Sequence, residues 1–135
     1  MLSYLYVAVG SAAGGVARWT VGNWMQRLAG GVPPAVFPVG TLVVNATGSF
    51  VLGLLSAWLI RPGAGARTEI MWLLLGVGFC GGYTTFSTFS LDTVALLETR
   101  GAVAATTNVV ASVSAGLIGV VAGMLLGRAA MARLA

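Results

Sequence analysis

The sequence predicts an all-α integral membrane protein, a single domain over residues 1–135 in which four transmembrane helices form a bundle. The chain carries seven basic and three acidic residues, and 58% of its residues are hydrophobic. Charged residues make up 7% of the chain, against roughly a quarter in a soluble domain, and the mean hydropathy is +0.96. This composition excludes a soluble enzyme, a nucleic-acid-binding protein and a disordered chain.

The four helices follow from the positions of the charges. Residues 28–60, 70–91 and 101–127 carry no charge, and the first 26 residues carry only Arg18. About 20 apolar residues cross the ~30 Å hydrocarbon core, so each stretch spans it once. Turn residues separate them, at 30–34, 61–65 and 99–101. The predicted helices cover about residues 2–25, 37–60, 70–98 and 101–127.

The first helix is expected to be retained, because Arg18 follows its apolar run, whereas a signal peptide carries basic residues before it. The other arginines are nearly balanced between the two predicted faces. One face carries Arg61, Arg67, Arg128 and Arg133, and the other Arg27 and Arg100. Excess basic residues mark the cytoplasmic side, so this weak bias is compatible with insertion in both orientations. A fixed topology with both termini cytoplasmic explains the count equally well.

Polar residues form a stripe along the second helix. Thr41, Asn45 and Ser49 follow one another every four residues, and Gly48 lies beside them. Such positions share one face of a helix. A polar group at this depth needs a partner or a water-lined cavity. Asn45 therefore either makes a hydrogen bond between helices or lines a pore.

The fourth helix carries a similar stripe of Asn108, Ser112 and Gly116. Glycines recur every four residues at Gly119, Gly123 and Gly127 and, in the first helix, at Gly10 and Gly14. Small residues at this spacing let two helices approach closely in a membrane. We therefore expect these glycines to serve helix packing and to have no chemical role.

The third helix is predicted to break near residues 79–85. Gly81 and Gly82 precede a run of hydroxyl residues, and both features disfavour a continuous helix. A break in the membrane frees carbonyl groups that must find partners, and hard oxygen atoms suit a small cation such as Na⁺. After the break, Phe86 and Phe89 share a face, with Ser90 beside them.

The predicted interior offers neutral hydrogen-bond donors in place of acids. Glu69, Asp92 and Glu98 fall at or near helix ends, whereas the amides of Asn45 and Asn108 lie inside. Phenyl rings add positively polarised edges. Donors and ring edges suit a small anion, because they bind it without a full positive charge that would trap it.

Three segments together resemble the fluoride channel family, Fluc or CrcB. They are residues 10–19 (GSAAGGVARW), 38–50 (PVGTLVVNATGSF) and 78–90 (GFCGGYTTFSTFS). The resemblance covers the whole chain and is loosest in the fourth helix. It implies a fluoride-specific channel in a microbial inner or plasma membrane that exports fluoride passively and is not an enzyme. It also implies an antiparallel homodimer in the lipid bilayer, with two pores lined by both subunits.

The resemblance also implies roles for individual residues. Phe86 and Phe89 would present ring edges to fluoride. The full set of pore residues would be Asn45, Phe86, Thr88, Phe89, Ser90, Asn108 and Ser112. Arg18 would lie near a vestibule of the pore. Gly81 and Thr84 would supply main-chain carbonyls to a structural Na⁺ at the centre of the dimer.

Two other functions are compatible with a small four-helix membrane protein. A small multidrug-resistance-type exporter needs a membrane-embedded glutamate in its first helix, which this chain lacks, and Arg18 would repel cationic drugs. A non-conducting structural subunit would leave Asn45 and the Phe86/Phe89 pair without a role.

Overall fold

The computed structural model describes residues 2–31, 33, 36–60 and 65–133, and within these ranges the chain forms helices and no strand. The elements in order are α1 (Leu2–Leu28), α2 (Val39–Leu59), α3 (Ala66–Met71), the π-type helix η1 (Trp72–Cys80), α4 (Gly81–Tyr83), α5 (Phe86–Arg100) and α6 (Ala102–Ala132). The all-α prediction is confirmed. Part of the predicted turns, including Arg61, lies outside the described residues.

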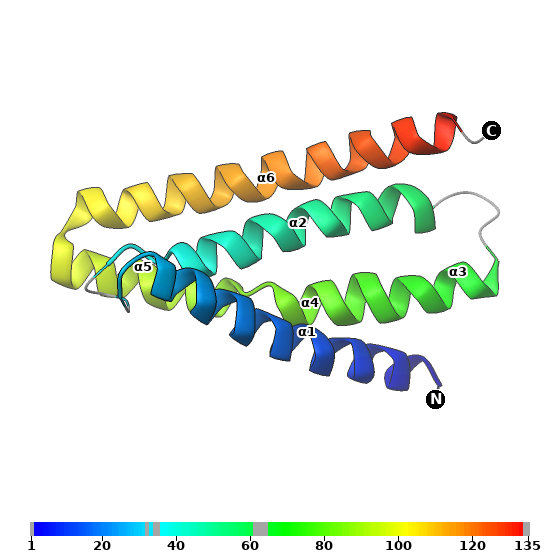
Figure 1. Cartoon of the computed structure of the whole chain (residues 1–135), viewed down its shortest axis with the longest axis horizontal. Coiled ribbons are helices and arrows are strands. Elements are labelled where there is room, and N and C mark those ends of the chain that lie inside the picture. Colours follow the sequence, from blue (N-terminus) through cyan, green and yellow to red (C-terminus); the bar gives the residue numbers. More distant parts are fainter. Residues whose placement is uncertain (1, 32, 34–35, 61–64, 134–135) are drawn as a thin grey trace.

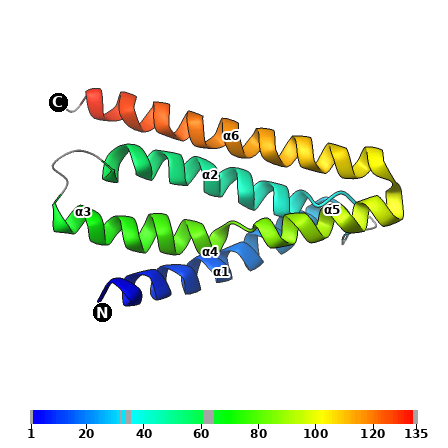
Figure 2. The same cartoon turned by 180° about the vertical axis from the view of Figure 1, so that it is seen from behind.

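The helices lie alongside one another (Figure 1). The elements α3, η1, α4 and α5 follow each other along one path, and α1, α2 and α6 run beside it. The N-terminus, the C-terminus and α3 lie at one end, and the junction of α5 and α6 lies at the other, as the reverse view also shows (Figure 2).

By length and composition, three segments of the described chain can cross a membrane: Val39–Leu59, Ala66–Arg100 and Ala102–Ala132. A multi-pass membrane protein is therefore supported. The helix α1 is 27 residues long but is not among the three, and its second half carries Arg18, Asn23, Gln26 and Arg27. That α1 also crosses the membrane stays a prediction.

The observed helices extend beyond some predicted ends. The helix α6 continues past Arg128 to Ala132, and α3 begins at Ala66 although residues 66–69 were expected to precede the helix. Arginine is a good helix former, and its long side chain lets the charged group reach the membrane surface. A charge therefore marks the edge of the apolar stretch without ending the helix.

Glycines bring α2 and α6 into close contact, as predicted. A Cβ added at Gly123 would collide with the Phe50 carbonyl oxygen, and one at Gly119 would lie 2.9 Å from the Ala46 carbonyl oxygen. On α1, a Cβ at Gly10 would collide with the Leu74 carbonyl oxygen of η1. These residues let helix backbones touch, which is how membrane helices associate without a hydrophobic driving force.

The tightest connection is between α5 and α6. Gly101 has a φ of +83° and serves both as the C-cap of α5 and as the N-cap of α6. Glycine adopts this left-handed conformation without a steric penalty. One residue therefore reverses the direction of the chain.

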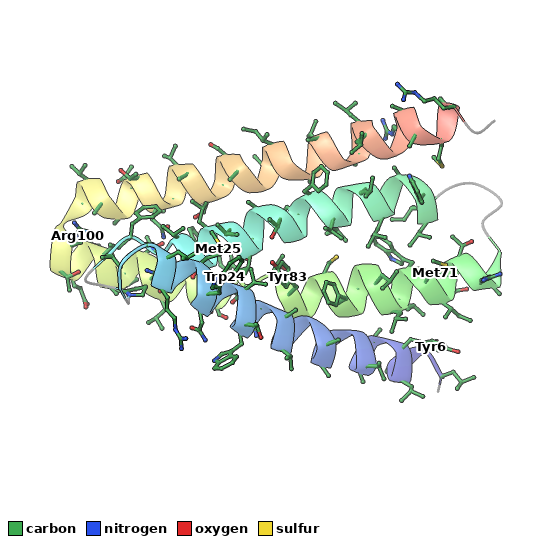
Figure 3. All side chains as sticks on the ribbon, viewed as in Figure 1. Tyr6, Trp24, Met25, Met71, Tyr83 and Arg100 are labelled. Atoms are coloured by element: carbon green, nitrogen blue, oxygen red, sulfur yellow. The ribbon has the colours of Figure 1, made fainter. Side chains whose placement is uncertain are left out.

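Many large apolar side chains lie on the outside of the single chain (Figure 3). Val103 is 82% exposed and Leu117 is 63% exposed on α6, whereas Val44 and Leu96 are almost completely buried. So many exposed large apolar side chains are unusual for a soluble protein. This surface suits contact with lipid or with another membrane protein.

Candidate functional site

The helical path between α4 and α5 is interrupted for two residues. Thr84 (φ −83°, ψ 159°) and Thr85 (φ −150°, ψ 115°) are extended. The sequence predicted a wider break, near residues 79–85, but Gly81 lies in a helical conformation with φ −64° and ψ −37°. The paired glycines therefore lie in helical backbone, and the interruption follows them at Thr84 and Thr85. That the interruption lies at mid-membrane stays a prediction.

Thr85 begins α5 by capping it. Its hydroxyl oxygen accepts a hydrogen bond from the Thr88 amide at 3.1 Å, and its hydroxyl donates to Thr88 Oγ1 at 3.0 Å. A threonine in extended conformation whose oxygen bonds the amide three residues later is a typical N-cap. The run of hydroxyl residues thus starts a new helix at Phe86.

Asn45 of α2 binds the interrupted backbone with both ends of its amide. Its Nδ2 donates to the Thr85 carbonyl oxygen at 3.0 Å, and its Oδ1 accepts from the Thr85 amide at 2.7 Å. The side chain thus pairs with the extended residue as a neighbouring strand would. Nδ2 has a second hydrogen, and Asn45 also lines a cavity.

The interruption diverts two backbone donors. In a continuous helix each amide donates to the carbonyl four residues earlier. Here the Thr85 amide donates to Asn45 and the Thr88 amide to Thr85 Oγ1. Gly81 and Thr84 therefore lose their usual helical donors. Gly81 is exposed in the single chain, and a Cβ added there would meet nothing within 4 Å.

A cavity of about 370 Å³, here called the aromatic groove, lies between α2, α5 and α6. Its lining consists of Asn45, Ser49, Phe86, Phe89, Ser112, Val113, Gly116, Leu117 and Val120. The rings of Phe86 and Phe89 are 5.6 Å apart between centroids and tilted by 50°. Phe86 is 79% exposed. The groove is therefore open along one side of the single chain.

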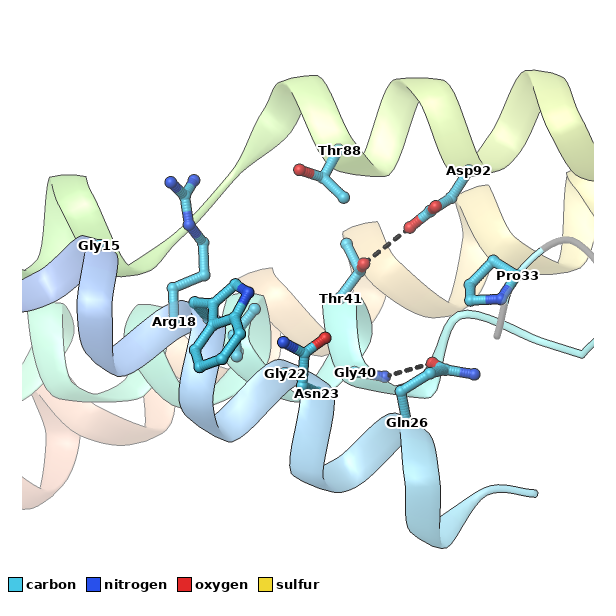
Figure 4. A pocket seen from close by; sticks show the side chains of 12 residues that line it. Gly15, Arg18, Gly22, Asn23, Gln26, Pro33, Gly40, Thr41, Thr88 and Asp92 are labelled. Atoms are coloured by element: carbon cyan, nitrogen blue, oxygen red, sulfur yellow. Dashed lines mark hydrogen bonds between the residues drawn. The ribbon is translucent and has the colours of Figure 1, made fainter. Parts of the chain in front are cut away.

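A second cavity of about 410 Å³, here called the polar pocket, lies between α1, α2 and α5. Figure 4 shows its lining, which consists of Gly15, Arg18, Trp19, Gly22, Asn23, Gln26, Pro33, Gly40, Thr41, Val44, Thr88 and Asp92. Thr41 Oγ1 donates to Asp92 Oδ2 at 2.6 Å. One pocket thus holds a guanidinium group and a carboxylate.

Asp92 corrects the expectation that acids stay out of the interior. Its side chain is 8% exposed and hydrogen-bonded to Thr41. The sequence placed it near the end of a helix, yet α5 continues to Arg100, so Asp92 lies two turns before the end. Asp92 lies only three residues after Phe89 in the sequence, yet the two side chains line different cavities. Asp92 lines the polar pocket, and Phe89 lines the aromatic groove.

The predicted pore residues separate into several places. Asn45, Phe86, Phe89 and Ser112 line the aromatic groove. Thr88 lines the polar pocket, together with Arg18, the residue predicted for the vestibule. The other two, Asn108 and Ser90, line neither cavity.

Asn108 is 1% exposed and donates to Thr93 Oγ1 at 2.8 Å, so it joins α6 to α5. The Ser112 hydroxyl donates a hydrogen bond to Asn108 Oδ1 at 3.4 Å. The hydroxyl of Ser90 donates to the Phe86 carbonyl oxygen at 2.9 Å. Their roles in conduction stay predictions.

The sequence did not single out Gln26, which is 8% exposed. Its Nε2 donates to the carbonyl oxygens of Gly31 (2.9 Å) and Phe37 (3.2 Å), and its Oε1 accepts from the Gly40 amide at 3.0 Å. It thus holds the end of the α1–α2 connection and the start of α2, where orphan amide groups need partners. A glutamine late in an apolar helix was the available signal.

Comparison with known proteins places these features in a family. Residues 5–124 match the family model described as CrcB-like protein, Camphor Resistance (CrcB). A protein of Rhizobium leguminosarum bv. trifolii (strain WSM2304) is 48% identical over 96% of this chain and 98% of its own length. A protein of Caulobacter sp. (strain K31) is 45% identical over 95% of this chain and 96% of its own length. A protein of Coxiella burnetii (strain Dugway 5J108-111) is 41% identical over 94% of this chain and 98% of its own length. Each is named fluoride-specific ion channel FluC.

Proposed function

This chain belongs to the CrcB-like protein family, and from that premise we propose that it is a fluoride-specific ion channel. It exports fluoride passively across a microbial inner or plasma membrane. The observation that carries the proposal is similarity over nearly the whole chain, at 41–48% identity, to relatives named fluoride-specific ion channel FluC. The three apolar segments agree with a multi-pass channel.

The chemistry of the aromatic groove supports a small anion. Asn45 has one amide hydrogen left after its bond to Thr85, and the rings of Phe86 and Phe89 have positively polarised edges. No basic residue is among the lining residues of this groove. Weak donors bind fluoride while leaving it free to move on, which conduction requires.

The start of α5 adds to this polarity. Phe86 is the first residue of this 15-residue helix and lines the groove. The N-terminal end of a helix carries a partial positive charge. An anion beside Phe86 therefore gains from the helix dipole as well as from the ring edges.

The polar pocket suits the entrance to this path. Arg18 attracts anions toward the pocket by its charge, and Thr88 lines the same pocket as Arg18. Asp92 accepts from Thr41 and offsets part of the arginine charge. An entrance with partly compensated charge collects anions without holding them.

The open side of the groove calls for a second copy of the chain. Phe86 is 79% exposed, and an ion path open to hydrocarbon would leave the anion unsolvated. We infer an antiparallel homodimer, in which the symmetric surfaces close two pores. The near balance of basic residues between the predicted faces is compatible with insertion in both orientations.

The same arrangement suits a structural Na⁺ at the dimer centre. Gly81 and Thr84 have lost their usual helical donors, and Gly81 faces open space. Carbonyl oxygens without partners are costly in a membrane, and oxygens of a broken helix are common ligands of Na⁺. The ion would neutralise their partial charges and join the two copies.

Reconstitution into liposomes tests the channel. Vesicles loaded with fluoride and containing the protein should release it when the charge is balanced by a K⁺ ionophore, as measured by a fluoride electrode. Empty vesicles and chloride-loaded vesicles are the controls. Absence of efflux above empty vesicles, or equal chloride efflux, would refute the proposal. No feature of the described residues favours a drug exporter or a non-conducting subunit.

A further inference from the structure

Tyr83 lies between the two residues proposed to hold Na⁺, in the short element α4. Its side chain is 9% exposed. Its ring stacks on the ring of Phe79, with 5.8 Å between the two centroids and an interplanar angle of 8°. Gly48 of α2 makes room for it, because a Cβ there would lie 2.9 Å from Tyr83 Cδ1 and collide with Thr84 Cγ2. Tyr83 is therefore packed firmly against α2.

The Tyr83 hydroxyl also binds α2. It lies 3.1 Å from Thr47 Oγ1. Thr47 has one hydroxyl hydrogen, and it donates this hydrogen to the Val43 carbonyl oxygen at 2.7 Å. The Tyr83 hydroxyl is therefore the donor and Thr47 the acceptor. This bond joins residues that are 36 positions apart in the chain.

The helix α2 thus holds the interrupted backbone on both sides of Thr84. Tyr83, before it, binds Thr47, and Thr85, after it, binds Asn45. A short extended segment between two anchors has few accessible conformations, whereas one anchor alone would let α4 turn. The directions of the nearby carbonyl groups depend on both anchors.

We propose that the hydrogen bond between Tyr83 and Thr47 is a brace that positions the carbonyls of Gly81 and Thr84 for Na⁺. Tyr83 is then a positioning residue, which does not itself touch the ion. The inference rests on the proposed function, because it concerns the Na⁺ site of that channel. The brace raises Na⁺ affinity by holding the ligands in place before the ion binds.

Two substitutions break the bond from opposite sides. Tyr83→Phe removes only the hydroxyl and keeps the ring, and Thr47→Val removes the acceptor and keeps the β-branched shape. The purified full-length protein is unfolded by heat in detergent at rising Na⁺, with choline keeping the ionic strength constant. The readout is the Na⁺ concentration that raises the melting temperature by one fixed amount, which scales with the dissociation constant for Na⁺.

We expect either variant to need about 2- to 10-fold more Na⁺, the range that one neutral hydrogen bond gives an equilibrium constant. Without Na⁺, each variant should melt close to the wild-type melting temperature. The main change should be in the Na⁺ concentration that the variant needs. The double variant should resemble each single variant, because both remove the same bond. If Tyr83→Phe does not fold, Thr47→Val alone decides.

Tyr4→Phe and Thr20→Val are matched controls. Tyr4 is 81% exposed. The Thr20 hydroxyl donates to the Val16 carbonyl oxygen at 2.9 Å, just as Thr47 donates four residues back, but accepts no bond from an aromatic residue in the described chain. Both controls should keep the wild-type Na⁺ requirement.

Each outcome separates the brace from the channel. An unchanged Na⁺ requirement in both Tyr83→Phe and Thr47→Val, with a Na⁺-responsive wild type, overturns the brace alone. A wild type that does not respond to Na⁺ overturns both the Na⁺ site and the brace. Fluoride efflux from liposomes is measured separately, so the channel function stands or falls on its own result.

Discussion

Replacing Asn45 by leucine should destabilise the protein through two backbone groups. The side chain now satisfies the Thr85 carbonyl at 3.0 Å and the Thr85 amide at 2.7 Å. Leucine has a similar size but no polar atom, so both groups would lose their partners. Thr85 is buried, which keeps water from replacing the lost bonds.

The expected loss follows from these two groups. Each buried backbone group left unpaired costs about 1–3 kcal/mol, so the pair costs about 2–6 kcal/mol. Asn45→Asp keeps an acceptor for the Thr85 amide but loses the donor, and its charge repels the carbonyl. Aspartate also introduces a charge that is costly away from water. The Asn45→Asp variant should therefore be no more stable than the Asn45→Leu variant.

Chemical unfolding in mixed micelles, followed by tryptophan fluorescence, measures the loss. Hydrogen exchange of the Thr85 amide gives a local test, because this amide should exchange much faster in Asn45→Leu. Asn23→Leu is the control, since Asn23 is exposed and binds no backbone group of another described helix. A loss of stability below about 1 kcal/mol, less than one unpaired group costs, would refute the reasoning.

Phe86→Ile and Phe89→Ile should strongly reduce fluoride efflux from liposomes while the protein still folds, because isoleucine is apolar but has no polarised ring edge; unchanged efflux would remove the rings from the path. Gly123→Ala should lower the free energy of unfolding by about 1–3 kcal/mol through overpacking, since its Cβ meets the backbone of α2, whereas Gly15→Ala, with nothing within 4 Å, should not. Equal effects of the two glycine substitutions would contradict the close approach. Cys80 is 1% exposed, so a maleimide should label it only after unfolding; rapid labelling of the native protein would show that η1 opens.

Spacing along one helix predicted local neighbours but not their destinations. Thr41, Asn45 and Ser49 do follow one side of α2, as the four-residue spacing indicated. The helix, however, passes two different cavities, so Thr41 reaches the polar pocket and the other two reach the aromatic groove. Helical periodicity defines a face, and the neighbouring helices decide what that face contacts.

Asn108 shows the same limit for a single residue. Its stripe with Ser112 on α6 gave no sign of its partner in the single chain, where Thr93 of α5 accepts its hydrogen bond. A buried amide finds a partner wherever one lies within reach. Whether this partner is an ion or a side chain depends on the packing of α5 against α6, which no pattern within α6 encodes.

The sequence by itself determined the class of protein, the apolar segments, the glycine contacts and the family. These properties depend on local features: the number and positions of charges, the spacing of small residues and a specific run of glycine, hydroxyl and aromatic residues. Tertiary structure alone decided how the polar groups pair. Thr85 on the Asn45 amide, Tyr83 on Thr47 and Asp92 on Thr41 join residues 36 to 51 positions apart. Hydrogen bonds act over about 3 Å, so such partners appear only once the helices are placed side by side.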